Sequence, residues 1–422
     1  MGYVGFDSSN PREDYLSGLF HKRYPNIKSL IFAESMDEKI AGIKSRFYQV
    51  YQREPELIVA APGRVNLIGE HTDYNDGFVL PIAIDRHIII ASAPQRGNKI
   101  HLYAANFDEI SVFRLDDIQY DQKDRWSNYQ RGIAKLIQES GYRLRGTKMV
   151  IWGDIPLGAG LSSSAAVEVA TALTFRIAND LPLSELELIK LAQRAENEFV
   201  GVNCGIMDQF VSCLGKKDNA LFLDCRSLDY KYVPLKTEDF KVVVCNTGKR
   251  RELIGSEYNR RREECREGVR LLRNYLPGIE ALRDVSSEDL RIHKGSLPAV
   301  IAKRCEHVVS ENQRVLQSVQ ALAGGETEEF GRLMNQSQTS LRDLFQVSCE
   351  ELDLMVEIAR GVDGVLGSRM TGAGFGGCTI SLVANEAISE LEKRILKIYP
   401  QKTGLRPEIY VCQSEDGARR IF

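Results

Sequence analysis

The first half of the chain alternates between amphipathic segments with helical spacing and short apolar runs typical of strands. From Met36 to Gln52, apolar residues recur every three or four positions, which predicts a helix with one buried face. Further helices are expected at 126–137 and 165–177, the second apolar enough to be largely buried. Runs rich in β-branched or apolar residues predict strands at 57–61, 78–84, 87–92, 99–115 and 147–152.

The second half changes from strands to helices near residue 240. An amphipathic helix is expected at 184–199, followed by strands at 219–224 and 240–245. Beyond them the pattern predicts helices at 255–275, 298–322 and 327–334. A chain of 422 residues exceeds what one hydrophobic core usually serves, so two domains are expected. The predicted division is an N-terminal extension without steady periodicity (1–35), an N-terminal domain (36–240) and a C-terminal domain (241–422).

Composition narrows the class of protein. The chain is 43% hydrophobic and 27% charged, and 55 Lys and Arg against 58 Asp and Glu give a net charge of -3. Without a basic excess, nucleic acid and anionic membranes are unlikely partners. The nine cysteines are odd in number, scattered and never spaced Cys-x-x-Cys, which favours reduced thiols in the cytoplasm over disulfides or a zinc site. Neither a secretion signal nor a membrane span is expected.

The run from Ala61 to Tyr74 concentrates polar chemistry behind a predicted strand. It places Arg64, Glu70, His71 and Asp73 after a Pro-Gly turn. Carboxylates accept hydrogen bonds from vicinal hydroxyls, and a guanidinium supplies fixed positive charge for a phosphoryl oxygen or an ionised base. The run could therefore hold a polyhydroxylated ligand. The alternative is a polar turn at a strand end with solvated charges.

Residues 154–166 form a glycine- and serine-rich loop between a predicted strand and a predicted helix. Gly158 and Gly160 allow positive φ, so successive amides can point at one anion. Ser162, Ser163 and Ser164 are expected to cap the helix and to add hydroxyl donors or a metal ligand. The loop is not a Walker A motif, because no lysine follows the glycines. Phosphate binding is predicted, and the alternative is a glycine turn with a serine cap.

Two further segments carry candidate chemistry. Asp208 lies in an apolar, glycine-flanked stretch and is a candidate acid or base, which must pair with a cation such as Arg64 or show a raised pKa. Glu196 could supply an oxygen ligand to Mg²⁺. Both could instead be cap or surface residues. The run 367–377 formally contains Gly-x-Gly-x-x-Gly, but a strand follows it where a dinucleotide motif would open a helix. A second glycine turn facing the phosphate loop, or a bulged strand entry, explains it better.

Together these segments resemble the GHMP small-molecule kinases, named for galactokinase, homoserine kinase, mevalonate kinase and phosphomevalonate kinase. Residues 63–77 are similar to the galactokinase signature, and 205–210 and 256–262 match as well. The resemblance extends from about residue 55 to the C-terminus. It implies an α+β fold of two domains, the first with a left-handed βαβ crossover and the second ferredoxin-like, with the active site in the cleft between them.

The resemblance also implies residue roles. Asp208 would accept the proton of the anomeric hydroxyl, with Arg64 stabilising its ionised form and the phosphoryl charge. The sugar would be bound by Glu70, His71, Asp73, Gly205 and Tyr258. Magnesium would be held by Ser163 or Ser164 and by Glu196. The residues expected at ATP are Trp126 and Tyr129 near adenine, for which core packing is the alternative, and Pro156, Gly158, Ala159, Gly160, Leu161, Ser162, Ser163, Ser164, Gly372 and Gly374.

The function this resemblance predicts is ATP- and Mg²⁺-dependent phosphorylation of the anomeric hydroxyl of α-D-galactose, by a cytoplasmic monomer. One alternative is a relative that acts on N-acetylgalactosamine, galacturonate or arabinose. The other is a sensor of the same fold that binds galactose and ATP without turnover. The complete serine loop and the presence of both Arg64 and Asp208 favour an enzyme over a sensor.

Overall fold

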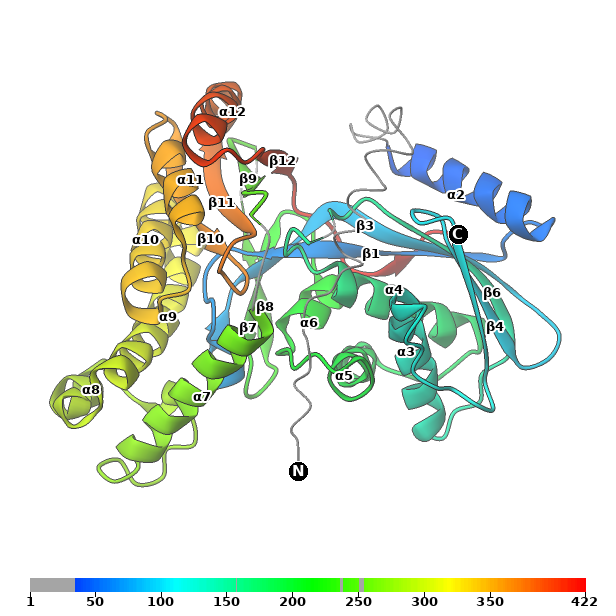
Figure 1. Ribbon diagram of the computed structural model, residues 1–422, viewed down its shortest axis with the longest axis horizontal. Helices are drawn as coiled ribbons and strands as arrows, with labels where there is room; N and C mark the ends of the chain where they lie inside the picture. Colours follow the sequence, from blue (N-terminus) through cyan, green and yellow to red (C-terminus); the bar gives the residue numbers. More distant parts are fainter. Residues whose placement is uncertain (1–34, 157, 236–237, 250–253) are drawn as a thin grey trace, which may run out of the picture.

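The computed structural model describes residues 35–156, 158–235, 238–249 and 254–422. Residues 1–34 of the predicted N-terminal extension lie outside the described residues. The described residues form two adjoining units, each a sheet packed between helices (Figure 1). The predicted α+β fold is confirmed. Within the described ranges, no helix combines the length and the apolar content needed to cross a bilayer.

A six-stranded sheet forms the centre of the N-terminal unit. β4 and β6 are parallel, joined through β5 and a helix, whereas the other pairs of this sheet are antiparallel. All ten residues of β1 are buried, because helices cover both faces of the sheet. In spatial order the strands are β13 (Arg419–Arg420), β1 (Leu57–Asn66), β3 (Pro81–Pro94), β6 (Thr147–Gly153), β4 (Lys99–Ala104) and β5 (Glu109–Arg114).

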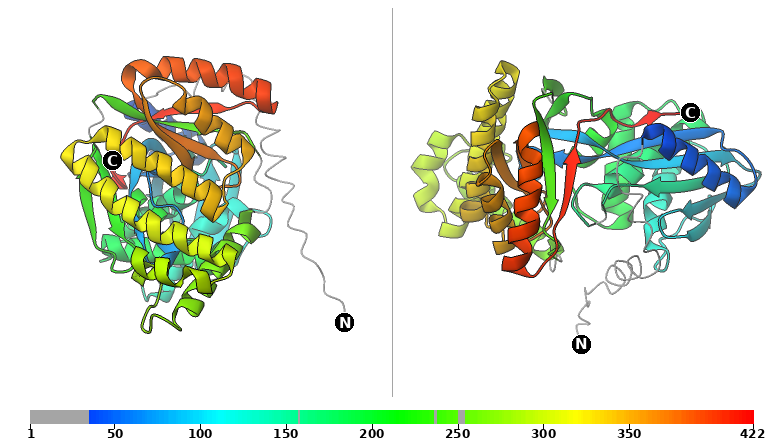
Figure 2. Two further views of the ribbon diagram at one scale, coloured as in Figure 1. Left: turned by 90° about the vertical axis from the view of Figure 1, so that its left-hand side faces the viewer. Right: turned by 90° about the horizontal axis from the view of Figure 1, so that it is seen from above.

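Alternate residues of β1 pack against helices on opposite faces of the sheet. On one face, α2 (Met36–Tyr51) starts with a capping box between Ser35 and Glu38 and buries Phe47 against Ile58. Val59 points to the other face. Figures 1 and 2 show α2 lying across the strands, with the remaining helices on the far side. Those helices are α3 (Asn128–Glu139), α4 (Ser163–Ala178), α5 (Glu185–Arg194) and α6 (Met207–Leu214).

The C-terminal unit contains a four-stranded antiparallel sheet. Its spatial order, β12-β9-β11-β10, is the 4-1-3-2 order of a ferredoxin-like domain, as predicted. One face packs on α11 (Glu350–Arg360) and α12 (Ile388–Thr403), and the other on α9 (Ala299–Gly324) and α10 (Thr327–Ser340). Two further helices, α7 (Ile254–Leu272) and α8 (Ser287–His293), extend this unit. The strands are β9 (Phe240–Asn246), β10 (Val365–Thr371), β11 (Cys378–Ala384) and β12 (Glu408–Cys412).

The two units are connected through a common apolar cluster and through the C-terminal end of the chain. A three-stranded sheet of β2 (Phe78–Val79), β7 (Asn219–Asp224) and β8 (Tyr230–Pro234) adjoins the first unit, and one apolar cluster includes residues of both large sheets. After β12 the chain returns to the first sheet, where β13 pairs with β1. The ranges 36–240 and 241–422 stay predictions, although this last strand belongs to the first sheet. A strand of two residues has no periodicity from which it could be predicted.

Candidate active site

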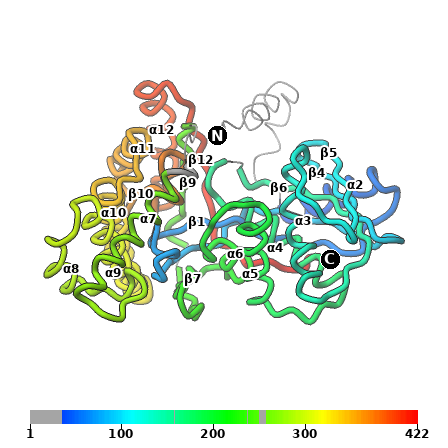
Figure 3. Tube along the Cα trace, turned by 60° about the horizontal axis from the view of Figure 1, so that its bottom comes forward, coloured from blue at the N-terminus to red at the C-terminus, as the bar shows by residue number. Residues whose placement is uncertain are grey.

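The ends of several elements meet where the two units adjoin. These are the carboxyl end of β1, the loop before α4, the first turn of α6, and the turn between β10 and β11. In Figure 3, α6 lies centrally, between α7 of the second unit and α3 of the first. Arg64, the serine-rich loop, Asp208 and the late glycine turn come from these ends, so segments distant in sequence share one region of the fold.

Arg64 and Asp208 form a partly buried ion pair at this junction. The register of β1 against β3 shifts between Pro62 and Arg64, and the Arg64 side chain is only 7% exposed. Its Nε donates to Oδ1 of Asp208 (2.7 Å), its Nη2 to Oδ2 (2.5 Å), and its Nη1 to the Gly160 carbonyl oxygen (2.7 Å). Burial lowers the pKa of Arg64, but the Asp208 carboxylate outweighs this and leaves the pKa above its ordinary value. The predicted pairing of Asp208 with a cation is confirmed.

The glycine- and serine-rich loop reaches this ion pair through its backbone. Gly158 and Gly160 have φ of 71° and 78°, as their predicted freedom requires. The Leu161 carbonyl oxygen accepts from the Arg64 amide (3.0 Å) and would lie 2.8 Å from a Cβ at Gly63, so this approach requires glycine there. Pro156 is half-buried beside the loop, and Ala159 and Leu161 anchor it in the apolar cluster between the sheets.

Ser162 corrects one expectation. It occupies the N-cap position of α4, but its φ of 58° turns the side chain away from the helix, and it makes no capping hydrogen bond. Its hydroxyl donates to Oδ2 of Asp208 instead. The first amides of α4 consequently lack a side-chain cap, which is the arrangement that an anion at a helix N-terminus uses.

Glu196 lies beside this loop in a π-helical turn, η4 (Ala195–Val200), and is 5% exposed. Its Oε2 accepts from Cys204 Sγ (3.1 Å) and Gln209 Nε2 (2.7 Å). Burial raises the pKa of Glu196, and the charge of Asp208 adds to this, while hydrogen bonds from Cys204 and Ser164 oppose it. A nearby cation would relieve this electrostatic cost.

Glu168 is a buried carboxylate that the sequence analysis missed. It lies one turn after Ser164 in α4, is completely buried, and accepts from Gln209 Nε2 (3.1 Å). Burial and the charge of Glu196 raise its pKa well above the ordinary range. An acidic residue in an otherwise apolar helix could have signalled it. Among the described residues, no group of three or more His, Cys, Asp and Glu could hold a metal ion by itself.

Asp73 and Gly205 lie in contact on the other side of Asp208. A Cβ at Gly205 would overlap the Asp73 carboxylate, so only glycine lets Asp73 keep this position. Burial raises the pKa of Asp73 to about 6, and the like charge of Asp208 contributes. The two carboxylates therefore face a common polar region.

Three rings line the same region. His71 has φ of 64°, and its Nδ1 lies 2.7 Å from the Tyr74 hydroxyl. The Tyr258 ring packs 5.3 Å from that of Tyr74 and 5.8 Å from that of His71, measured between ring centroids. Burial lowers the pKa of His71 to about 3, so the ring is neutral at physiological pH. The structure thus brings together four of the five predicted sugar-binding residues: His71, Asp73, Gly205 and Tyr258.

Glu70, the fifth, is engaged within the protein. Its Oε1 accepts from the Thr371 hydroxyl and the Gly372 amide, both at 3.1 Å. Its Oε2 accepts from Asn66 Nδ2 (2.9 Å) and lies 2.5 Å from Arg369 Nη2. Three hydrogen bonds and one ion pair thus engage both oxygens of the Glu70 carboxylate. A direct sugar contact by Glu70 remains a prediction.

The late glycine turn faces the phosphate loop, as expected. Gly372 and Gly374 have φ of 83° and 86°, and a Cβ at Gly372 would lie 3.9 Å from the Gly160 carbonyl oxygen. At Gly374 the Val347 carbonyl leaves no room for a side chain. Positive φ therefore favours glycine at both positions, and close backbone approach also requires it at Gly374.

The two aromatic residues predicted near adenine lie together before and within α3. Trp126 packs against the N-terminal core, but its indole Nε1 is buried without a hydrogen-bond partner among the described residues. Such a donor is costly unless a ligand or water meets it. Tyr129 is half-buried one turn later. Their contact with a nucleotide stays a prediction.

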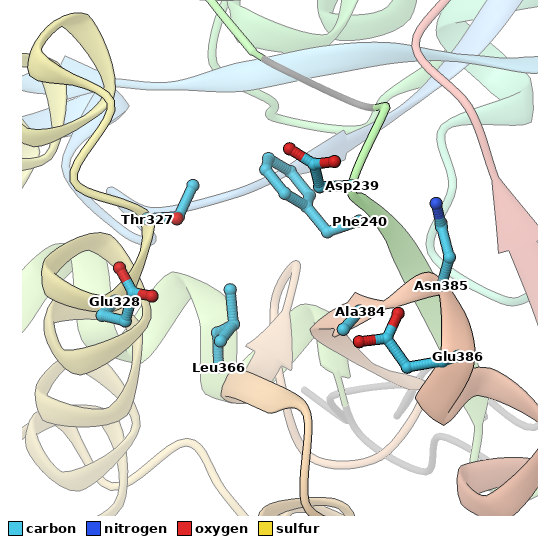
Figure 4. Close-up of a pocket in the computed structure, with 8 residues that line it drawn as sticks. All are labelled: Asp239, Phe240, Thr327, Glu328, Leu366, Ala384, Asn385 and Glu386. Carbon is cyan, nitrogen blue, oxygen red and sulfur yellow. The ribbon is translucent and has the colours of Figure 1, made fainter.

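A cavity of about 400 Å³ lies elsewhere, at one end of β9 and α10 (Figure 4). It contains none of the predicted site residues, and its lining, as far as the structure describes it, carries three carboxylates and no cation. Such a lining does not suit a phosphorylated ligand. The cavity is lined by Asp239, Phe240, Thr327, Glu328, Leu366, Ala384, Asn385 and Glu386.

The fold and the paired glycine loops define a small-molecule kinase of the GHMP class. Residues 128–216 match the N-terminal domain of GHMP kinases, and 318–400 match their C-terminal domain. A mevalonate kinase structure from Methanococcus jannaschii shares the fold at 20% identity, with a TM-score of 0.62, covering 85% of this chain and 98% of its own.

Other matches are more specific and include the segment with the predicted sugar-binding residues. Residues 45–94 match the galactokinase galactose-binding signature. A galactokinase of Roseiflexus sp. (strain RS-1) is 48% identical, over 90% of this chain and 97% of the relative, and that of Staphylococcus carnosus (strain TM300) is 42% identical, over 90% and 99%. The crystal structure of Lactococcus lactis galactokinase complexed with galactose has a TM-score of 0.86 at 36% identity, covering 90% of this chain and 99% of its own. The chain belongs to the galactokinase family.

Proposed function

We propose that this enzyme transfers the γ-phosphoryl group of ATP to the anomeric hydroxyl of α-D-galactose, giving galactose 1-phosphate and ADP. The observation that carries the proposal is the Arg64–Asp208 ion pair, which lies between the serine-rich loop and the Asp73–Gly205 contact. This pair supports the proposal because Asp208 can accept a hydroxyl proton between the predicted phosphate site and the predicted sugar site. Membership of the galactokinase family supports the choice of sugar.

Counting partners among the described residues, Asp208 keeps one acceptor position for the substrate. Its Oδ1 accepts one hydrogen bond from Arg64, whereas its Oδ2 accepts from both Arg64 and Ser162. A carboxylate offers about four acceptor positions, two on each oxygen. We assign the remaining position on Oδ1 to the C1 hydroxyl. As the bond from O1 to the γ-phosphorus forms and the bond to the bridging oxygen of ADP breaks, the hydroxyl proton passes to Asp208.

Arg64 keeps its charge throughout this step. It stabilises the ionised form of Asp208 before transfer and can stabilise the charge on the phosphoryl group during transfer. The uncapped amides of α4 and the backbone of residues 158–164 bind the ATP phosphates. Trp126 and Tyr129 contact the adenine, and the unpaired indole Nε1 is a donor that a base can satisfy.

The residues beside the loop fit a magnesium ion. Mg²⁺ binds through one or two carboxylates, waters and substrate phosphates, and Glu196 with the hydroxyl of Ser163 or Ser164 supplies such a set. When bound, the ion neutralises phosphate charge. Glu196 has a raised pKa in the protein alone, which fits a ligand whose partner arrives with the nucleotide.

His71, Asp73, Gly205 and Tyr258 bind the remaining hydroxyls of the sugar, Asp73 as acceptor and Gly205 by making room for it. We also propose that the enzyme acts as a cytoplasmic monomer. All nine cysteines, which lie within the described residues, carry thiols rather than disulfides, and this supports a reducing compartment.

The test is an ADP-release assay of the purified enzyme with ATP and Mg²⁺. Galactose, glucose, N-acetylgalactosamine, galacturonate and arabinose are compared at equal concentration. We expect the highest kcat/KM with galactose. Higher kcat/KM with another of these sugars would overturn the substrate, and lack of turnover with every sugar, in protein that binds galactose, would identify a sensor.

A further inference from the structure

A second group of buried charges lies directly behind residues 66–72, which we call the sugar loop. Arg369 of β10 is completely buried. Its Nη1 donates to the carbonyl oxygens of Leu67 (3.0 Å) and Asn66 (3.3 Å), and its Nη2 lies 2.5 Å from Glu70 Oε2. One arginine of the C-terminal unit therefore holds both the backbone and a carboxylate of the loop that the N-terminal unit supplies.

Glu311 of α9 binds the same loop from the other side. It is completely buried, and its Oε1 accepts from the Gly69 amide (3.1 Å) and from the Ser337 hydroxyl (2.6 Å). Its Oε2 accepts from Arg314 Nε (2.7 Å), and its Oε1 lies 3.7 Å from Arg369 Nη2. Two arginines thus face two carboxylates, Glu70 and Glu311, so the buried charges balance.

The loop conformation needs this support. Gly69 has φ of 101°, and two residues later His71 has φ of 64°. Residues other than glycine seldom adopt this left-handed region of the backbone. Such a backbone persists only where its surroundings fix it. The Arg369 and Glu311 contacts reach Asn66, Leu67, Gly69 and Glu70, which are the residues immediately before His71.

We propose that Arg369 is a positioning residue for sugar binding, which with Glu311 fixes the sugar loop so that His71 and Asp73 face the substrate. The inference rests on the proposed function, because it takes this loop as the sugar side of the site. Arg369 is fully buried behind the sugar loop. It acts through Glu70 and the loop backbone, which gives the engaged carboxylate of Glu70 a role that needs no sugar contact.

The test compares Arg369→Lys with the wild type in galactose and ATP titrations. Lysine keeps the charge but cannot reach two carbonyl oxygens and a carboxylate together. We expect the KM for galactose to rise by on the order of tenfold or more, as for the loss of a charge-assisted hydrogen bond, with less than about threefold change in the KM for ATP. Equal rises in both KM values, or a galactose KM within about twofold of wild type, would overturn the proposal.

Two further variants separate positioning from folding. Arg369→Met leaves two carboxylates facing Arg314 alone, and the double variant Arg369→Met/Glu311→Gln removes the surplus charge. We expect the double variant to regain melting temperature over Arg369→Met but not galactose affinity, since the loop carbonyls still lack their donor. Recovery of both together would show a purely structural role and contradict the proposal.

Arg304→Lys is the matched control. Arg304 is 2% exposed and bonds Glu264 (2.6 Å) and the Leu344 carbonyl (2.5 Å) within the C-terminal helices. We expect it to lower the melting temperature without the selective rise in galactose KM, and such a rise would contradict our assignment to Arg369. Lack of galactose turnover by the wild type would instead contradict the proposed function.

Discussion

Replacing Arg64 by lysine tests the central ion pair. The guanidinium makes three hydrogen bonds, two to Asp208 and one to the Gly160 carbonyl oxygen. A lysine ammonium is a compact charge that cannot span these acceptors in the same geometry, so one or two of the bonds are lost. Each charge-assisted bond contributes about 1.5–3 kcal/mol, so losing one or two destabilises the transition state by about 1.5–6 kcal/mol, or roughly 10- to 25,000-fold in kcat/KM.

The assay measures kcat/KM by ADP release and the melting temperature by circular dichroism. The chain offers a matched control, because Arg114 forms the same two-bond pair with Asp116 (2.8 and 2.5 Å) on the surface. Both side chains of that pair are more than half exposed, so water screens the interaction and Arg114→Lys should leave activity unchanged. A kcat/KM of Arg64→Lys within about threefold of the wild-type value would refute the reasoning.

Gly205→Ala places a methyl group where the Asp73 carboxylate lies. The KM for galactose should therefore rise at least about tenfold, while circular dichroism shows an intact fold. An unchanged KM would show that Asp73 is not held there. Because the pKa of Asp73 is raised to about 6, protonation below that pH removes an acceptor; the KM for galactose should therefore increase as pH falls through 6, and this increase should be absent in Asp73→Asn. The raised pKa also means that the stability contributed by protonated Asp73 is lost as pH rises through about 6. The melting temperature of Asp73→Asn, relative to that of the wild type, should therefore be higher at pH 8 than at pH 5. Chelation of divalent ions should abolish ADP release while galactose binding, followed by calorimetry, persists; full turnover in excess chelator would exclude the magnesium site.

Much of the site could be predicted because it depends on residues close in sequence or on charges that need a partner. An Asp208 that is largely withdrawn from solvent favours a cation beside it, and Arg64 follows a glycine turn that lets the chain approach closely. The glycines at 158 and 160 show their purpose through the positive φ that they adopt. The same local reasoning predicts most helices and strands, since their apolar periodicity reflects which face is buried.

The remainder depends on contacts between segments distant in the chain. Ser162 resembles a cap in sequence, yet its left-handed backbone sends the hydroxyl to Asp208, 46 residues away. Glu70 reads as a free carboxylate until the fold brings Arg369 to it from the other unit. β13 is too short to carry a pattern of its own. Sequence spacing therefore predicts which groups are available, whereas the tertiary fold decides which of them are already paired.

Asp208→Asn tests the proposed transfer most directly. The amide keeps the shape of the side chain but cannot accept the hydroxyl proton. With galactose, ATP and Mg²⁺, phosphorus NMR should show an anomeric sugar phosphate for the wild-type enzyme and none for Asp208→Asn, although calorimetry shows that the variant still binds galactose. Formation of the same sugar phosphate by Asp208→Asn at a rate close to that of the wild type would contradict the account.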